Sequence, residues 1–86
     1  MLSPEYDQVW HAYVRELGAK LYRFRVERGL SQEKLAVLAG ISSFTYRKLE
    51  KGESNPGTDA NPRLRTLVSI AKVLEIDVKE LLPDRL

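Results

Sequence analysis

Hydrophobic residues recur three and four positions apart along most of the chain, which is the spacing of one face of an α-helix. Ser3 and Pro4 predict where the first helix begins, because serine caps helix N-termini and proline fits the first helical position. The apolar stripe that follows consists of Tyr6, Val9, Trp10, Tyr13, Val14, Leu17, Leu21 and Phe24. We therefore expect one long helix that weakens at Gly18 and ends near Arg28-Gly29.

The segment from Ser31 to Gly52 predicts two short amphipathic helices joined by a tight turn at Gly40. Ser31 and Ser42 stand where N-caps are expected, and Gly40 supplies the positive φ that a chain reversal requires. The inner faces consist of Leu35, Ala36 and Ala39 in the first helix and of Ile41, Thr45, Tyr46 and Leu49 in the second.

The remaining third of the chain predicts a loop followed by two more helices. Residues 53–61 are typical of a loop in composition, and Asn61-Pro62 predicts the start of the next helix. The inner face of that helix consists of Leu64, Leu67, Ile70, Ala71 and Leu74. Asp77 and Glu80 form the pattern of a capping box for a last short helix. No segment alternates apolar and polar residues over the length of a strand, so the sequence predicts an all-α fold.

Composition limits the classes of protein that fit. A chain of 86 residues is one small domain, and the absence of cysteine excludes disulfides and thiol chemistry. No apolar run is long enough for a signal peptide or a membrane span, so we expect a cytoplasmic protein. The net charge is only +2, but the window from Leu17 to Lys51 holds eight basic and three acidic residues. Such a window is typical of a nucleic-acid binder, although charge clusters on small helical proteins are often only solvated faces.

The predicted helix over residues 42–51 carries Ser43, Phe44, Arg47 and Lys48 on the side that its core face does not use. A short helix with hydrogen-bond donors and a flat apolar group facing outward suits the DNA major groove. Phe44 has a second interpretation, in which it packs on the loop that follows. His11 is the only histidine and has no catalytic partner nearby in sequence, so we expect neither an enzyme, nor a metal site, nor a cofactor.

From about Leu17 to Leu82 the chain resembles the phage-repressor-like helix-turn-helix family, also called Xre or Cro-type. The residues that carry the resemblance are Arg-x-x-Arg-Gly-Leu-Ser-Gln from Arg25 to Gln32, Leu35-Ala36, Ala39-Gly40, Ile41-Ser42, Leu49-Glu50-Lys51-Gly52, Asn61-Pro62, Thr66-Leu67, Ala71, Leu74 and Glu80-Leu81-Leu82. The resemblance implies a compact five-helix lambda-repressor-like domain over residues 17–86, preceded by a helical extension over residues 1–16 that is continuous with the first helix.

The resemblance also implies a function. Members of the family regulate transcription by binding double-stranded operator DNA, generally as a twofold pair, so we expect a homodimer, a palindromic operator and the role of a repressor or autoregulatory switch. The helix over 42–51 is expected to read the major groove. The expected DNA-binding residues are Gln32, Ser42, Ser43, Phe44, Thr45, Arg47, Lys48, Lys51, Arg63 and Arg65. Arg25 and Glu50 match a pair that forms a largely buried salt bridge in relatives.

The chain departs from the family pattern in three places. The loop after Gly52 is longer than usual, Phe44 stands where many relatives have a polar reader, and Tyr46 replaces an aliphatic core residue.

The aromatic stripe near the N-terminus leaves two interpretations open. The stripe consists of Tyr6, Trp10, Tyr13 and Leu17. It either folds onto the last two helices, over Leu82 and Leu86, or forms an interface with a second copy or another protein, in which the expected contact residues are Tyr6, Trp10, Tyr13 and Leu82. The second interpretation carries an alternative function, that of an antitoxin-like or adaptor module in which the stripe grips a partner.

Overall fold

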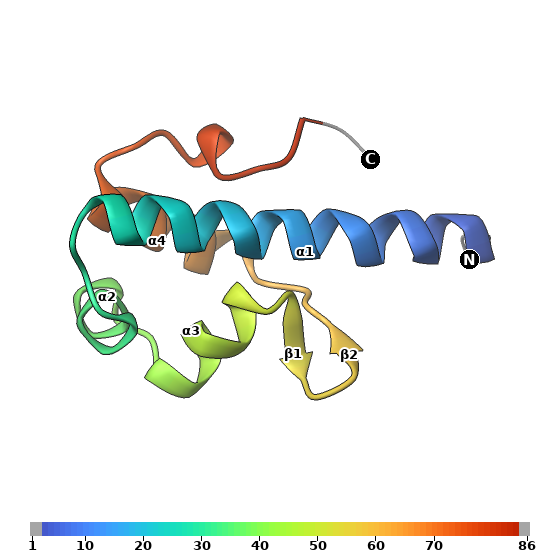
Figure 1. The fold of residues 1–86 in the computed structure, drawn as a ribbon, viewed down its shortest axis with the longest axis horizontal. Coiled ribbons are helices and arrows are strands. Elements are labelled where there is room, and N and C mark those ends of the chain that lie inside the picture. Colours follow the sequence, from blue (N-terminus) through green and yellow to red (C-terminus); the bar gives the residue numbers. More distant parts are fainter. Residues whose placement is uncertain (1–2, 85–86) are drawn as a thin grey trace.

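A computed structural model describes residues 3–84 of the chain. The elements are the helices α1 (Pro4–Glu27), α2 (Gln32–Ala39), α3 (Ser43–Glu50) and α4 (Leu64–Leu74), the strands β1 (Glu53–Asn55) and β2 (Thr58–Asp59), and a short 3₁₀ turn, η1 (Val78–Glu80). The long helix α1 forms the axis of the molecule (Figure 1). Helices α2 and α3 and the two strands lie on one side of α1, and the C-terminal segment with η1 runs back along the other side (Figure 1).

The core lies where these elements meet, and side chains from every α-helix fill it. The fully buried large side chains are Val14, Leu17, Leu21, Leu35, Tyr46, Ile70, Leu74 and Leu81. Small residues complete the core where helices approach closely, as Ala36 does on α2 and Ala71 on α4. In the described part of the chain, no helix combines the length and the apolar character that a membrane crossing needs.

The start and end of α1 agree with the sequence, but Gly18 does not weaken it. The Ser3 hydroxyl accepts from the Tyr6 amide at 3.2 Å, and Arg28 caps the other end. The helix continues unbroken through Gly18, which is buried where α1 crosses α3. A Cβ at this position would lie 2.3 Å from the carbonyl oxygen of Glu50. The glycine is therefore needed for close approach of two helices.

The helix-turn-helix segment forms as predicted, with one exception. Gly40 adopts a φ of 75° between α2 and α3, and the hydroxyls of Ser31 and Ser42 accept from the amides of Lys34 and Thr45, each at 3.0 Å. Thr45, which the sequence placed on the inner face, is exposed. Its hydroxyl accepts from Ser42 Oγ at 2.8 Å, at the outer edge of the first turn of α3.

The predicted fold class is confirmed, because the described residues are mostly helical, but the prediction of a loop is wrong for residues 53–59. These residues form an antiparallel hairpin of β1 and β2. Pro56 and Gly57 make the turn, and Gly57 has a φ of 80°. Proline followed by glycine is the signature of a type II turn. The strands hold only three and two residues, too few for an alternating pattern to show in the sequence.

The hairpin also changes where α4 begins. The sequence predicted Asn61 as the cap, whereas the helix begins at Leu64 with Arg63 in the cap position. The Ala60 amide donates to the Gly52 carbonyl at 2.8 Å, which closes the base of the hairpin and leads the chain on in an extended path. Leu64 consequently lies in the first turn and is 69% exposed, not part of the core face.

The last predicted helix is only the 3₁₀ turn η1, so the described residues contain four α-helices rather than the five helices expected. Its predicted capping box is confirmed, with both the Asp77 and the Glu80 side-chain contacts present. A segment this short ends before an α-helical turn can propagate, because Leu81 is drawn into the core and Pro83 follows.

The first half of α1 holds the hairpin, which the sequence did not predict. The Trp10 indole donates from Nε1 to the Ala60 carbonyl at 3.0 Å, and His11 Nδ1 lies 2.6 Å from Asp59 Oδ1. Trp10 also stacks on Tyr13, with ring centroids 5.4 Å apart. Trp10 thus contacts the base of the hairpin, which neither interpretation of the stripe included. The expected contact of the stripe with Leu86 falls outside the described residues, and an interface with a partner stays a prediction.

The close crossing at Gly18 generates the first prediction. Replacing glycine by alanine inside a helix normally stabilises it by about 0.5–1 kcal/mol. We expect Gly18→Ala instead to lower the free energy of unfolding by about 1–3 kcal/mol, because the added methyl group meets the backbone of Glu50. Urea unfolding followed by circular dichroism measures the change. The matched control is Ala12→Gly on the exposed face of α1, which measures propensity alone; a stabilised Gly18→Ala variant would contradict the packing argument.

Candidate nucleic-acid interface

Helix α3 is fixed by its inner face and presents the rest of its surface outward. Tyr46 and Leu49 are buried against α1 and α2, whereas Phe44 on the opposite face is 59% exposed. Arg47 and Lys51 are exposed as well, and Lys48 is partly buried. The predicted outward orientation of Phe44 is therefore what the structure has.

The carboxylate of Glu50 joins three helices at the end of α3. Arg25 on α1 donates to both of its oxygens, from Nε at 2.6 Å and from Nη2 at 3.2 Å. Gln32 at the start of α2 donates at 2.9 Å, and the Tyr46 hydroxyl at 2.5 Å. The side chains of Arg25 and Glu50 are only 12% and 7% exposed, and a third Arg25 nitrogen donates to the Leu30 carbonyl at 2.8 Å. The buried Glu50 carboxylate and its three partners, Arg25, Gln32 and Tyr46, thus form one hydrogen-bonded network, called the Glu50 network below.

This network controls the protonation of its members. Burial by itself raises the pKa of Glu50, but the hydrogen bonds from Arg25, Tyr46 and Gln32 together outweigh it and leave the pKa below the usual value. Burial, and then the hydrogen bond to Glu50, raise the pKa of Tyr46. The Glu50 carboxylate therefore stays charged and the Tyr46 hydroxyl stays protonated at neutral pH. In these states the hydroxyl donates and the carboxylate accepts.

The network also accounts for Tyr46, which departs from the family pattern. An aliphatic residue at this position fills the core, but it offers nothing to the carboxylate one helical turn later. The tyrosine ring is fully buried, and its hydroxyl reaches Glu50 across that turn. Buried tyrosines generally need such a partner for their hydroxyl. Tyr46 thus combines core packing with a fourth hydrogen bond to the network.

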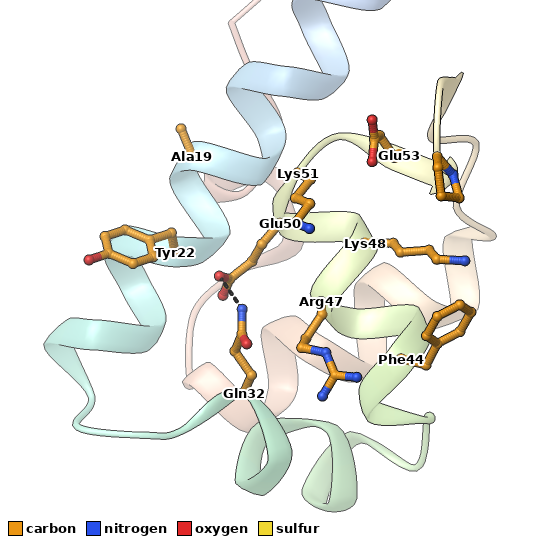
Figure 2. Close-up of a pocket in the computed structure, with 10 residues that line it drawn as sticks. Ala19, Tyr22, Gln32, Phe44, Arg47, Lys48, Glu50, Lys51 and Glu53 are labelled. Atoms are coloured by element: carbon orange, nitrogen blue, oxygen red, sulfur yellow. Dashed lines mark hydrogen bonds between the residues drawn. The ribbon is translucent and has the colours of Figure 1, made fainter.

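A hollow of about 560 Å³ lies beside α3, and half of the predicted DNA-binding side chains line it. Gln32, Phe44, Arg47, Lys48 and Lys51 all line it. Figure 2 shows Glu50 pointing toward Gln32 on one side of α3, with Phe44 and Lys48 together on the side of the hairpin. The side-chain amide of Gln32 donates to Glu50, so it links the start of α2 to the end of α3.

The other predicted residues lie around this hollow in different ways. Thr45 and Arg63 line a second cavity of about 210 Å³, between α3 and the start of α4. Ser42 caps α3 and Ser43 opens it, while Arg65 is exposed on the first turn of α4 and lines neither cavity.

Lys48 connects the hairpin to the outer face of α3. Its ammonium nitrogen lies 3.4 Å from the centroid of the Phe44 ring, and 3.5 Å from Oδ1 of Asn55 at the end of β1. A cation over a phenyl face contributes about 0.5–1 kcal/mol at an exposed site. The side chain is therefore held between an aromatic ring and the hairpin.

The sequence analysis missed several residues at the site. Tyr22 on α1 and Pro56 at the hairpin tip line the larger hollow, and Asn55 contacts Lys48. Glu33 on α2 pairs with Arg47 at 3.4 Å between largely exposed side chains. The sequence could have indicated Tyr22, because an aromatic residue outside the apolar stripe of α1 is expected to be exposed and available for contacts. The hairpin residues had none, since their contacts depend on a turn that brings distant positions together.

The charge balance of this side of the molecule remains positive after these pairings. Glu50 is already engaged by Arg25, and Glu33 reaches only the guanidinium of Arg47. Lys51 forms no ion pair among the described residues, and neither does Arg63. Within residues 3–84, no three histidine or acidic side chains are grouped so that they could hold a metal ion. The surface thus offers cationic and hydrogen-bonding groups.

Comparison with known proteins identifies the family to which the chain belongs. The chain matches the HTH_3 helix-turn-helix family over residues 21–81, which confirms the resemblance found in the sequence. It therefore belongs to the helix-turn-helix family, which is not an enzyme family.

Particular relatives extend the comparison. The chain is 35% identical over 67 residues to RstR, the cryptic phage CTXphi transcriptional repressor of Vibrio cholerae, and the match covers 78% of this chain and 55% of the repressor. The chain thus spans about half the length of that relative. The restriction-modification controller protein C.AhdI of Aeromonas hydrophila has a similar structure, with a TM-score of 0.73, 31% identity and coverage of 83% of this chain and 98% of that one.

A second similar structure is that of SinR, the master regulator for biofilm formation, in complex with DNA. Its TM-score is 0.65 at 26% identity, and the match covers 76% of this chain and 95% of the other. The matched family region begins at residue 21, so the hairpin support from Trp10 and His11 lies outside it.

The Glu50 network generates the second prediction. Tyr46→Phe removes one donor to a buried carboxylate, so we expect the free energy of unfolding at neutral pH to fall by about 1.5–3 kcal/mol. Glu50 has a lowered pKa in the folded protein, so its contribution is present above the unfolded pKa and is lost as the pH falls through the folded pKa. The difference between wild type and variant should therefore shrink in acid.

Urea unfolding at a series of pH values from neutral downward measures this difference. The matched control is Tyr22→Phe, which removes the hydroxyl of a tyrosine that is 55% exposed and should change little at any pH. A loss for Tyr46→Phe that is the same at neutral and acidic pH would show that the hydroxyl acts through packing and not through the carboxylate.

Proposed function

We propose that the protein is a DNA-binding transcription regulator that reads the major groove with α3. The observation that carries this proposal is the outward face of α3, which presents Phe44, Arg47 and Lys51 on a helix whose inner face is fixed by the Glu50 network. A rigid helix with its N-terminal residues outward matches the geometry in which helix-turn-helix proteins contact base edges. The relatives include a transcriptional repressor and a regulator crystallised with DNA.

The proposed residues divide into two roles. Phe44, Arg47 and Lys48 face the groove, where an arginine or lysine can donate to guanine O6 and N7. Lys51, Arg63 and Arg65, together with Ser42, Ser43, Thr45 and Gln32, set the register of the helix through contacts near the sugar-phosphate backbone. Residues 17–86 form the DNA-binding unit in this proposal, and the extension over residues 1–16 supports the hairpin through Trp10 and His11.

Repression by a symmetric pair is the form of regulation that we propose. Two copies would bind a palindromic operator with half-sites about 34 Å apart, one turn of the double helix. Tyr6, Trp10, Tyr13 and Leu82 remain the proposed contact residues between copies. The adaptor alternative uses the same stripe to grip another protein, and it differs from the proposed pair in predicting no preference among DNA sequences.

Selection of bound duplexes from a random pool is the experiment that tests the function. We expect the purified chain to enrich one sequence, and the enriched sequence to be palindromic with half-sites one turn apart. An enriched sequence without symmetry would contradict the proposed pair but not DNA recognition. A pool that shows no enrichment, with equally weak binding of every duplex even in dilute buffer, would contradict the proposed function.

Two substitutions on α3 test the assignment of the interface. We expect Arg47→Ala and Lys48→Ala each to weaken binding of the selected duplex by about tenfold or more, because each removes a donor facing the groove. A residue that contacts a base should lose affinity for the selected sequence only. A residue that contacts a phosphate should weaken all duplexes and reduce the slope of log affinity against log salt by about 0.9. Fluorescence anisotropy titrations at several salt concentrations measure both quantities.

The control for these substitutions is Lys79→Ala. Lys79 carries the same charge on η1, which lies on the opposite side of α1 from α3 (Figure 1). We expect this variant to bind as the wild type does. Equal losses for Lys79→Ala and the α3 variants would show that net charge, and not the face of α3, determines binding.

A further inference from the structure

The exposed ring of Phe44 is the feature of the interface that charge and hydrogen bonding do not explain. It occupies the first turn of α3 and is 59% exposed, although leaving a phenyl ring in water forfeits the free energy that its burial would yield. Exposure alone assigns no ligand, because Val37 and Leu64 are exposed too. What sets Phe44 apart is its position among the groups that face the groove and the way its ring is held.

Lys48 holds the ring from one face. Its ammonium nitrogen lies 3.4 Å from the ring centroid, one helical turn further along α3, and the same nitrogen contacts Asn55 of the hairpin. The ring is therefore supported by a side chain that is itself supported by the hairpin. It does not pack down onto the hairpin, since most of its surface stays exposed even though Pro56 lines the same hollow. The remaining apolar surface of the ring is free to contact a partner.

The chemistry of the major groove limits what such a ring can recognise. Base edges there present hydrogen-bond donors and acceptors, and one apolar group, the C5-methyl of thymine. Phenylalanine has neither donor nor acceptor, so it cannot read the hydrogen-bonding pattern. We propose that Phe44 is a specificity-determining residue that recognises thymine by contact with its C5-methyl group. The proposal rests on the proposed function, because it requires α3 to lie in the groove.

The test removes the methyl group without changing base pairing. Each thymine of the selected duplex is replaced in turn by uracil, and binding is measured by fluorescence anisotropy for the wild type, Phe44→Ala and Val37→Ala. We expect uracil at one position of each half-site to weaken wild-type binding by about three- to fivefold, the effect of losing one buried methyl group. Phe44→Ala should bind the thymine and uracil duplexes at that position equally well.

Two further readouts separate this role from a structural one. A 5-bromouracil at the sensitive position should restore wild-type affinity, because bromine has nearly the size of a methyl group. Phe44→Ala should keep the wild-type salt dependence, since it removes no charge. It should lower the unfolding midpoint only slightly, since most of the ring is exposed and the contact with Lys48 is the main one lost. Val37→Ala changes an exposed apolar residue of α2, and it should retain the full sensitivity to uracil.

The outcomes distinguish this proposal from the one on which it rests. A selected duplex that the wild type binds equally well with uracil at every position would overturn the role of Phe44 and leave the proposed function intact. Equal sensitivity to uracil in wild type and Phe44→Ala would also overturn it. A chain that selects no sequence would overturn both proposals together.

Discussion

The carboxylate of Glu50 is the interaction on which the arrangement of the helices depends. The carboxylate receives hydrogen bonds from one residue of α1, one of α2 and one of α3 itself. The backbone carbonyl of the same residue lies against Gly18 of α1. A buried charge is tolerated only when it is fully paired, and removing one partner of such a pair costs about 3–5 kcal/mol. The network therefore penalises any displacement of α3 relative to α1 and α2. The same contacts that satisfy a buried charge also fix the direction of the outward face.

A second feature is the link between the hairpin and the first half of α1. The connection after α3 folds into the hairpin, and the segment before the matched family region supplies Trp10 and His11, which hold the base of that hairpin. The hairpin in turn contacts Lys48 on the outer face of α3. These two segments thus form one structural unit, and the hairpin lies beside the surface proposed to meet DNA.

The division of labour on α3 follows from these two constraints. The Glu50 network acts on the inner face and sets the position of the helix, whereas the hairpin acts on Lys48 and through it on Phe44. Recognition by a short helix requires that few side chains reach the groove and that each is well placed, because ordering a loose side chain on binding reduces affinity. A partly buried lysine and a ring held by a cation meet that requirement better than fully solvated side chains do.

The sequence by itself determined the helices, the turn at Gly40 and the serine caps, because these depend on neighbouring residues and on local hydrophobic spacing. It also identified Phe44 and Arg47 as outward residues of α3, since that face is what remains when Tyr46 and Leu49 turn inward, but it placed the exposed Thr45 on the inner face. It missed the hairpin, because strands of three and two residues carry no periodic signal. It consequently also missed the true start of α4, which follows the hairpin. Only the tertiary structure decided that Trp10 holds Ala60, that Gly18 is a crossing point and that Lys48 covers Phe44. The first two contacts join residues that are distant in sequence, and the third depends on the direction in which the Lys48 side chain turns. The local spacing of hydrophobic and polar residues predicts neither kind of contact.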